Sequence, residues 1–291
     1  DYHGGMADMQ KKTLRMIGDP AKRYREDPVR MLRAIRFAAK TGFTLDAATR
    51  APIAKLGKLL QDVPSARLFD EILKLLMSGY SWAAIQGLKD AGLHHGLLPL
   101  LDHILDDGEA SKGANSFVKL ALANTDQRIQ SGKSVSAGFL FATLLWPDLL
   151  RNWKANSAKG MANIPALHDA MDDTIAAQSS GMTIQRRFES DMREIWSMQP
   201  RFERRVGRYP FRLIESPRFR AGYDFMLLRC ATGELNPAIG QWWTDFIAAD
   251  PTGQEELMAS VKNATGNPAS PAKRRRRRKP KSATPPESAA S

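Results

Sequence analysis

Asp27 and Arg30 are the two residues whose types and spacing first suggest a chemical role. A carboxylate accepts hydrogen bonds from an exocyclic amine, and a guanidinium donates to ring nitrogens or a carbonyl, so the pair could read the edge of a nucleobase. Residues three apart on a helix are neighbours, so the two side chains would lie together. Helix chemistry offers a simpler alternative, in which Asp27 caps the helix and Arg30 is solvated.

The helix that must position this pair has a clear start at Pro28, whose missing N–H suits the first helical position. Asp27 then falls at the N-cap with Glu26 beside it, where the positive end of the helix dipole favours carboxylates. Gly42 is expected to end the helix. The helix would have an apolar face of Met31, Leu32, Ile35, Ala38 and Ala39 and an opposite face of Arg30, Arg33, Phe37 and Lys40. Phe37 on that second face could offer stacking surface to a base.

Three charged residues share one face of another helix, which is predicted over residues 66–77: Arg67, Glu71 and Lys74 lie at positions i, i+4 and i+7. One interpretation is a solvated stripe of salt bridges, worth about 0.2–0.5 kcal/mol per pair. The other interpretation is that these residues brace the first helix, which would require buried partners. The sequence alone leaves both open.

The rest of the sequence predicts helix after helix without an alternating strand pattern, so the fold class is all-α, with no sheet of three or more strands. A helix capped by Asp46 is expected through Leu60, and a short helical pattern near the start runs through Leu14 and Ile17. The clearest later helices cover residues 84–91, 117–123, 137–145, 164–177, 184–198 and 219–228. The expected core anchors are Trp146, Trp153, Trp196, Trp242 and Trp243.

Composition excludes several classes of protein. No run of 18 apolar residues occurs, so no membrane span or membrane partner is expected. The single cysteine, Cys230, excludes an internal disulfide, fits a reducing cytosol and is expected to be a buried small hydrophobe. His94 and His95 have no cysteine or carboxylate at ligand spacing, so we expect no metal site.

The last 29 residues, 263–291, differ from the rest because they contain almost no large apolar side chain. Such a segment cannot offset its ordering entropy and is expected to be disordered. Much of the net charge of +12 lies within it, which indicates a polyanionic partner bound through phosphates. The predicted RNA-binding residues are Lys273, Arg274, Arg275, Arg276, Arg277, Arg278, Lys279 and Lys281.

Residues 25–37 resemble the Glu-Asp-x-x-Arg motif of class II nucleotidyltransferases, the group that contains bacterial poly(A) polymerases and tRNA CCA-adding enzymes. The longer run 16–43, in one register, closely resembles the bacterial poly(A) polymerases of this group, and a looser similarity extends over 81–250. Residues 1–8 resemble the Asp-x-x-Gly-Gly-x-x-Asp segment that joins the catalytic head of such enzymes to the neck.

The resemblance implies four parts. They are the end of the head with a linker (1–22), a neck that reads the nucleotide and binds RNA (23–80), a helical body (81–262) and a disordered Arg-rich tail (263–291). It also implies nucleotide-binding roles for Glu26, Asp27, Arg30 and Arg33, and a bracing role for Arg67, Glu71 and Lys74.

The activity that the resemblance implies is the transfer of AMP from ATP to RNA 3′ ends, by a monomeric cytoplasmic enzyme in mRNA polyadenylation, RNA processing and decay. Such enzymes catalyse with two Mg²⁺ ions held by carboxylates of the head. No Asp-x-Asp occurs in the 291 residues, so we expect no catalytic or metal-binding residue in this chain and no activity of the chain alone. Two alternatives stay open: a tRNA CCA-adding enzyme, and a non-catalytic helical RNA-binding protein.

Overall fold

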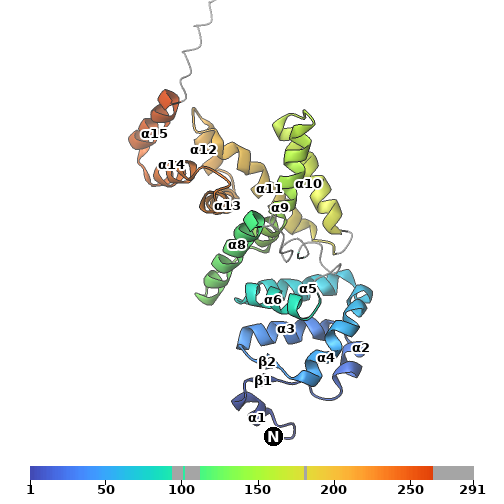
Figure 1. Ribbon diagram of the computed structural model, residues 1–291. Coiled ribbons are helices and arrows are strands. Elements are labelled where there is room, and N and C mark those ends of the chain that lie inside the picture. The colour runs from blue at the N-terminus through green and yellow to red at the C-terminus, as the bar shows by residue number, and fades with distance from the viewer. Residues whose placement is uncertain (94–100, 102–111, 180–181, 265–291) are drawn as a thin grey trace, which may run out of the picture.

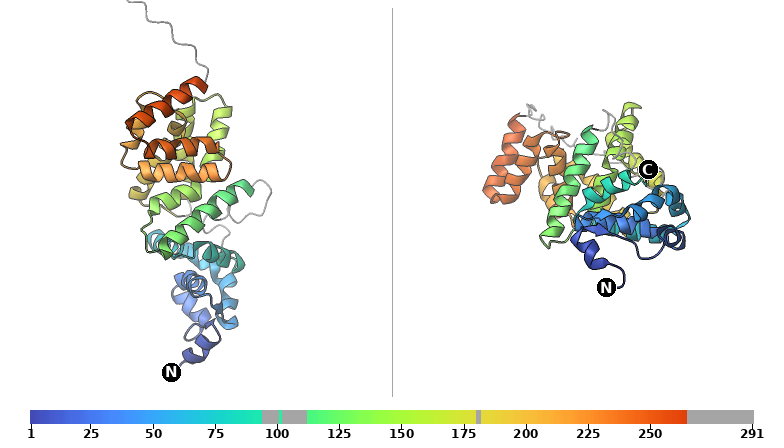
Figure 2. Two further views of the ribbon diagram at one scale, coloured as in Figure 1. Left: turned by 90° about the vertical axis from the view of Figure 1, so that its left-hand side faces the viewer. Right: turned by 60° about the horizontal axis from the view of Figure 1, so that its bottom comes forward.

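The computed structural model describes residues 1–93, 101, 112–179 and 182–264, and these residues are almost entirely helical, as predicted. Figure 1 and the left view of Figure 2 show an elongated molecule, with α1 (Gly5–Gln10) at one end and α15 (Pro251–Ala264) at the other. Within the described residues the β-structure is a single parallel pair, β1 (Thr13–Leu14) with β2 (Thr44–Leu45). The prediction of no sheet of three strands is therefore confirmed for this part of the chain.

Within the described residues up to 93, short helical elements follow α1, and the longer α8 (Lys112–Gln130) comes after them. The short elements are α2 (Pro20–Glu26), α3 (Val29–Thr41), α4 (Ala47–Leu56), the 3₁₀ helix η1 (Gly57–Asp62), α5 (Ser65–Leu76) and α6 (Ser81–Asp90). Local rules set several of their ends. Asp46 caps α4 by accepting from the N–H groups of Ala48 and Thr49, as predicted. Gly42 ends α3 with a φ of 68°, a left-handed conformation that glycine adopts without steric cost.

The predicted helical pattern through Leu14 and Ile17 is wrong. The helix ends at Gln10, and Thr13 and Leu14 instead pair in parallel with Thr44 and Leu45. Lys12 adopts a φ of 49°, which a non-glycine residue rarely does and which an α-helix cannot contain. The strand partner lies about 30 residues away in sequence, so no local pattern could reveal it.

The second half consists of long helices joined by short connections. They are α9 (Ala137–Ala158), α10 (Asn163–Ser179), α11 (Arg186–Met198), η3 (Gln199–Glu203), α12 (Tyr209–Ile214), α13 (Phe219–Ala231), α14 (Pro237–Ala248) and α15. Helix α9 packs against α8, α10, α11 and α13, so it forms the centre of this half. Helices α10 and α13 extend their predicted ranges slightly, α9 continues to Ala158 instead of ending at residue 145, and α11 begins at Arg186 instead of residue 184.

Two hydrophobic cores hold the helices together. The larger core runs from Tyr24 on α2 to Phe225 and Leu228 on α13, and the smaller one gathers Phe202, Trp243 and Phe246 near the end of the described chain. Trp146, Trp196, Trp242 and Trp243 are buried, as predicted, whereas Trp153 is only half-buried. Cys230 is buried and has no disulfide partner, also as predicted.

Two predictions fall on residues outside the described ranges. His94 and His95 lie wholly outside them, and the predicted tail 263–291 lies outside them from residue 265 onward. Helix α15 extends to Ala264, two residues beyond the predicted end of the body.

Candidate nucleotide-binding site

The candidate site lies where α3 packs against α5. Helix α3 buries Met31, Leu32 and Ile35 of its predicted apolar face. Val29 and Ala34 are buried as well, whereas the predicted Ala38 and Ala39 are only half-buried. Burial of that side leaves Arg30 and Arg33 to project from the remaining surface. Helix α5 presents Arg67, Glu71 and Lys74 to the same region, so the structure brings the two predicted groups together.

Asp27 forms ion pairs with one arginine from each helix. Its Oδ2 accepts a hydrogen bond from Arg67 at 2.8 Å and lies 3.6 Å from the Nε of Arg30, while the carboxylate is only 12% exposed. Its other oxygen, Oδ1, is buried and has no hydrogen-bond partner within the described residues. The carboxylate therefore has an acceptor position that the protein does not use.

The prediction that Asp27 caps α3 is wrong for the side chain. The structure gives α3 no side-chain cap, and only the backbone carbonyl of Asp27 accepts from the N–H of Arg30. A residue before proline is forced into extended backbone, and Asp27 has φ −150° and ψ 92°. The carboxylate instead accepts from Arg67, forty residues further on, where both the donor and the acceptor are charged.

Glu71 is the second buried acid of the site, with 3% of its side chain exposed. Its Oε1 accepts from Arg33 at 2.8 Å and from Lys74 at 3.0 Å. Burial opposes ionisation of this carboxyl, but the hydrogen bonds from Arg33 and Lys74 outweigh it and hold the pKa of Glu71 below its ordinary value. The same hydrogen bond raises the pKa of Arg33. The stripe on α5 is thus not simply solvated, because its acid is buried between two cations.

The arginines of the site keep part of their surface open. Arg30 is 29% exposed and Arg67 is 49% exposed, and each guanidinium has more N–H groups than its contacts here use. The buried carboxylate of Asp27 pairs with both guanidinium groups, and the N–H groups that these contacts leave over are partly exposed to solvent. Such an arrangement can present guanidinium donors to a planar polar ligand, with the carboxylate of Asp27 directly beside them.

The other residues predicted for this region are placed less centrally. Glu26 pairs with Arg23 at 3.1 Å, on an exposed surface of α2. Phe37 is exposed, and the guanidinium of Arg36 lies over its ring at 4.4 Å from the centroid. The predicted stacking surface is therefore already partly covered by Arg36.

Two supporting features were missed at the level of sequence. Asp19 caps α2 by accepting from the N–H of Lys22, and Pro20 begins that helix. The signal was present, because an acid before a proline is the pattern that was interpreted as a cap at Asp27. Tyr24 on α2 is buried and donates its hydroxyl to the carbonyl of Thr49 at 3.0 Å. Burial raises the pKa of Tyr24 to about 12.

The first residues of the chain form a small polar cluster beside β1. Arg15 pairs with Asp8 at 2.9 Å and with Asp46 at 3.1 Å, and the hydrogen bond from Arg15 lowers the pKa of Asp8. Asp1 accepts from the N–H of Met6. These contacts attach the first segment to the start of α4.

No group of three or more histidine, cysteine, aspartate or glutamate residues with the geometry to hold a metal ion occurs in the described part of the chain. No helix there has the length and apolarity needed to cross a membrane.

Comparison with known families gives two matches. A family described as "Probable RNA and SrmB- binding site of polymerase A" matches residues 42–105, which include α5. A second family, "Polymerase A arginine-rich C-terminus", matches residues 159–281.

Comparison with individual proteins agrees with these matches. Poly(A) polymerase I of Salmonella typhi is 38% identical over 290 residues, which cover 98% of this chain and 60% of that protein. Poly(A) polymerase I of Escherichia coli O6:H1 is 37% identical over the same shares. The CCA-adding enzyme of Bacillus velezensis is 42% identical over 93 residues, or 32% of this chain. The chain thus spans about 60% of the length of its poly(A) polymerase relatives.

Among solved structures, one described as tRNA-processing enzyme complex 3 has a TM-score of 0.53 and 16% sequence identity. The similarity covers 92% of this chain and 69% of that one. At this level of identity the likeness concerns the fold alone.

Proposed function

Because the chain belongs to the poly(A) polymerase I family and corresponds to its carboxy-terminal portion, we propose that it supplies adenine recognition and RNA binding to an enzyme that adds AMP from ATP to RNA 3′ ends. The observation that carries the proposal is the Asp27–Arg30 pair, in which a partly open guanidinium lies beside a carboxylate with a spare acceptor. Adenine presents an amine donor next to a ring-nitrogen acceptor, and this pair is its complement.

Helix α5 supplies an ion-pair partner to Asp27 and to Arg33. Arg67 holds the carboxylate of Asp27, and Glu71 holds Arg33, while Lys74 shares the charge of Glu71. We assign Arg67, Glu71 and Lys74 to positioning, because their contacts are with other side chains of the site. Arg33 supports the pair or faces a phosphate, and Glu26 contributes negative charge near the start of α3.

The test is Arg30→Ala in the full-length enzyme that contains this chain. Loss of a charge-assisted hydrogen bond should lower kcat/KM for ATP, by an amount that corresponds to about 1–3 kcal/mol of lost transition-state stabilisation. Discrimination against other nucleotides should fall as well. Arg23→Ala, which removes an arginine from an exposed pair on the preceding helix, is the matched control and should leave both unchanged. Unchanged ATP kinetics and base choice in Arg30→Ala would refute adenine reading by this pair.

We propose that the catalytic residues lie outside these 291 residues. We assign the Mg²⁺-binding carboxylates of the reaction to the head of such enzymes, because the sequence has no Asp-x-Asp and no acidic cluster among the described residues fits the metal. Purified residues 1–291, given ATP, Mg²⁺ and an oligo(A) primer, should therefore not extend the primer. Extension by this chain alone would show that the catalytic carboxylates lie within it.

The basic run from Lys273 to Lys281 is proposed to bind RNA through its phosphates. A single-stranded contact contributes about −0.7 to the slope of log K against log salt, so eight contacts set a limit of about −5 to −6. Deletion of residues 264–291 should weaken RNA binding and flatten this slope without loss of helix content by circular dichroism. Equal slopes for the two proteins would place the RNA track on the helices instead.

A tRNA CCA-adding enzyme is the alternative within the same group. The two readings differ in base choice, since a CCA-adding enzyme incorporates CTP as well as ATP. We favour ATP alone, because similarity to the poly(A) polymerases covers 98% of the chain and similarity to the Bacillus velezensis enzyme covers 32%. A monomer in the cytoplasm, acting on RNA 3′ ends, completes the proposal.

A further inference from the structure

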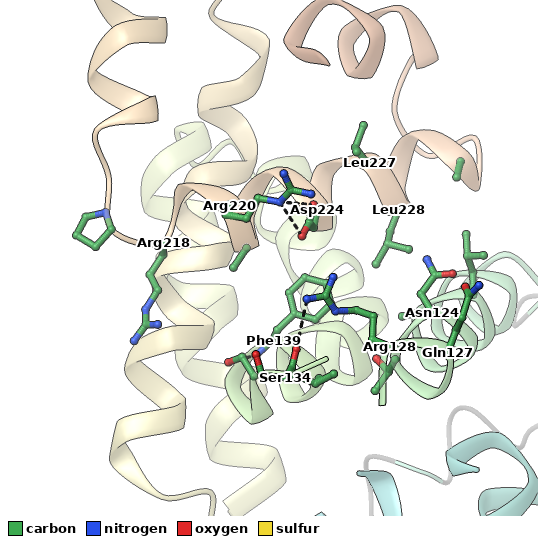
Figure 3. Close-up of a pocket in the computed structure, with 18 residues that line it drawn as sticks. Asn124, Gln127, Arg128, Ser134, Phe139, Arg218, Arg220, Asp224, Leu227 and Leu228 are labelled. Atoms are coloured by element: carbon green, nitrogen blue, oxygen red, sulfur yellow. Dashed lines mark hydrogen bonds and ion pairs between the residues drawn. The ribbon is translucent and has the colours of Figure 1, made fainter. Parts of the chain in front are cut away.

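A cavity of about 710 Å³ opens between α8, the start of α9 and α13, apart from the site on α3 and α5. Figure 3 shows side chains from all three elements converging on it. Its size falls within the range of small-molecule and cofactor pockets, which are commonly about 300–1,000 Å³. The cavity is therefore large enough for one nucleotide.

The floor of the cavity is apolar. Phe139 from α9 and Leu227 and Leu228 from α13 line it, and all three belong to or pack against the hydrophobic cores. The ring of Phe139 is held edge-on to buried Phe225, with centroids 6.2 Å apart. Because this floor is already ordered, binding of a flat apolar ligand would cost little conformational entropy of the protein.

The rim of the cavity is polar. Asn124 and Gln127 project from α8, and no hydrogen bond of either side-chain amide occurs within the described residues. A side-chain amide has both donors and an acceptor, so it can match any base edge. These two amides lie one helical turn apart and face the same opening.

The charge of the rim is positive. Arg218 is already paired with Asp191 and Arg220 with Asp224, so these two cations are neutralised. Arg128 differs, because the bond that it makes is to the backbone carbonyl of Ser134, at 3.3 Å, and no carboxylate in the described part of the chain pairs with it. Its guanidinium keeps a full charge at the mouth of the cavity.

We propose that this cavity holds one nucleotide of a single-stranded RNA, with the base over the apolar floor, its edge at Asn124 and Gln127, and its phosphate at Arg128. Three features coincide in one place: an apolar floor, two amides whose side chains make no hydrogen bond to the described residues, and one arginine that no described carboxylate pairs with. An RNA nucleotide needs that combination, since it has a base face, a polar edge and a phosphate. The inference rests on the proposed RNA-binding function and adds an anchor for the strand away from its 3′ end.

The first test is a binding series with the whole 291-residue chain and fluorescently labelled oligo(A). Arg128→Ala should weaken binding about 5- to 10-fold and make the salt slope shallower by about 0.7, the value for one phosphate contact. Gln127→Ala should weaken binding and leave the slope unchanged, because an amide releases no counterion. Lys154→Ala removes the same charge from an exposed part of α9 outside the cavity, and its affinity should change less than about twofold.

The second test locates the strand. A 4-thiouridine-substituted oligonucleotide, irradiated on the chain and analysed by peptide mass spectrometry, should crosslink to residues 120–139 or 217–231. Crosslinks to the basic tail are expected in addition. Absence of crosslinks to both cavity segments, or equal affinities for Arg128→Ala and Lys154→Ala, would overturn the proposal. An oligoglutamate peptide that binds in an Arg128-dependent way, while RNA does not, would also overturn it and assign the cavity to an acidic protein segment.

These outcomes are separable from the proposed function. If Arg30→Ala lowers ATP use and Arg128→Ala leaves RNA binding unchanged, the cavity inference fails and the adenine site stands. If Arg128→Ala weakens RNA binding and Arg30→Ala has no effect on ATP use, the reverse holds.

Discussion

Arginine–carboxylate ion pairs occur in two regions of the molecule, and the exposure of the arginine differs between them. One region is the site on α3 and α5, and the other is the junction of the two hydrophobic cores. At the junction, Arg229 donates to Glu234 at 2.8 Å and to Gln199 at 3.2 Å, with only 6% of the arginine exposed. The indole N–H of Trp146 donates to the second oxygen of Glu234 at 2.7 Å, and the guanidinium lies 4.9 Å from the ring centroid of Trp146. Both charges are enclosed and satisfied.

On α3 and α5, by contrast, only the acids are enclosed. Asp27 and Glu71 are buried, while the arginines that pair with them remain open to solvent. A closed network of this kind holds two cores together, because its charged groups are paired with one another within the protein. An open network positions donors for another molecule. Exposure of the cation, rather than the presence of an ion pair, separates the two roles.

Arg229→Ala should have the largest effect on stability. It would leave Glu234 and Gln199 without their partner in a buried setting, and removal of one member of a buried pair typically costs about 3–5 kcal/mol. Urea unfolding followed by circular dichroism measures the loss. Arg151→Ala, which breaks an exposed pair with Asp148, should cost no more than about 1 kcal/mol. A similar cost for both variants would remove the contrast between closed and open networks.

Glu71→Gln should have an intermediate effect. The substitution keeps the shape and removes the charge that Arg33 and Lys74 share, and because both cations are partly exposed we expect a loss of about 1–2 kcal/mol in the free energy of unfolding. Glu26→Gln is the matched control on an exposed pair, and it should change stability by less than about 0.5 kcal/mol. In the full-length enzyme Glu71→Gln should also raise KM for ATP, since Arg33 loses its anchor.

Tyr24→Phe tests a neutral contact in the same region. The hydroxyl donates to the carbonyl of Thr49, and its removal takes away one buried hydrogen bond, so a loss of about 0.5–1.5 kcal/mol is expected. The variant should leave base choice in the full-length enzyme unchanged, because Tyr24 attaches α2 to α4 and does not belong to the arginine network. A change in nucleotide selectivity would mean that the packing of α2 helps to set the site.

The pH dependence of Glu71 gives the smallest and most specific signal. Its pKa is lower in the folded chain than the ordinary value of 4.5, so the unfolded chain binds the proton more tightly. The stabilisation it provides is complete above the ordinary value and is lost as pH falls through the lower pKa of the folded state. The difference in unfolding free energy between the native protein and Glu71→Gln should therefore shrink only under acidic conditions. A difference that stayed constant with pH would mean that the charge of Glu71 contributes nothing.

Much of the local structure follows from sequence alone. The cap at Asp46, the glycine end at Gly42 and the apolar face of α3 are each set within one or two turns of helix, so short-range rules predict them correctly. The same holds for the neighbourhood of Asp27 and Arg30, which the helical repeat brings together. An all-α fold is likewise a sum of such local preferences.

Contacts between distant segments were decided only by packing. The choice of Asp27 between a cap and an ion pair depended on Arg67, and the burial of Glu71 depended on how α5 meets α3. The strand at Thr13–Leu14 required a partner beyond α3, and the cavity beside Arg128 required three helices to converge. Charge attraction and burial act between whichever groups the fold brings close, and one-dimensional spacing does not contain that distance.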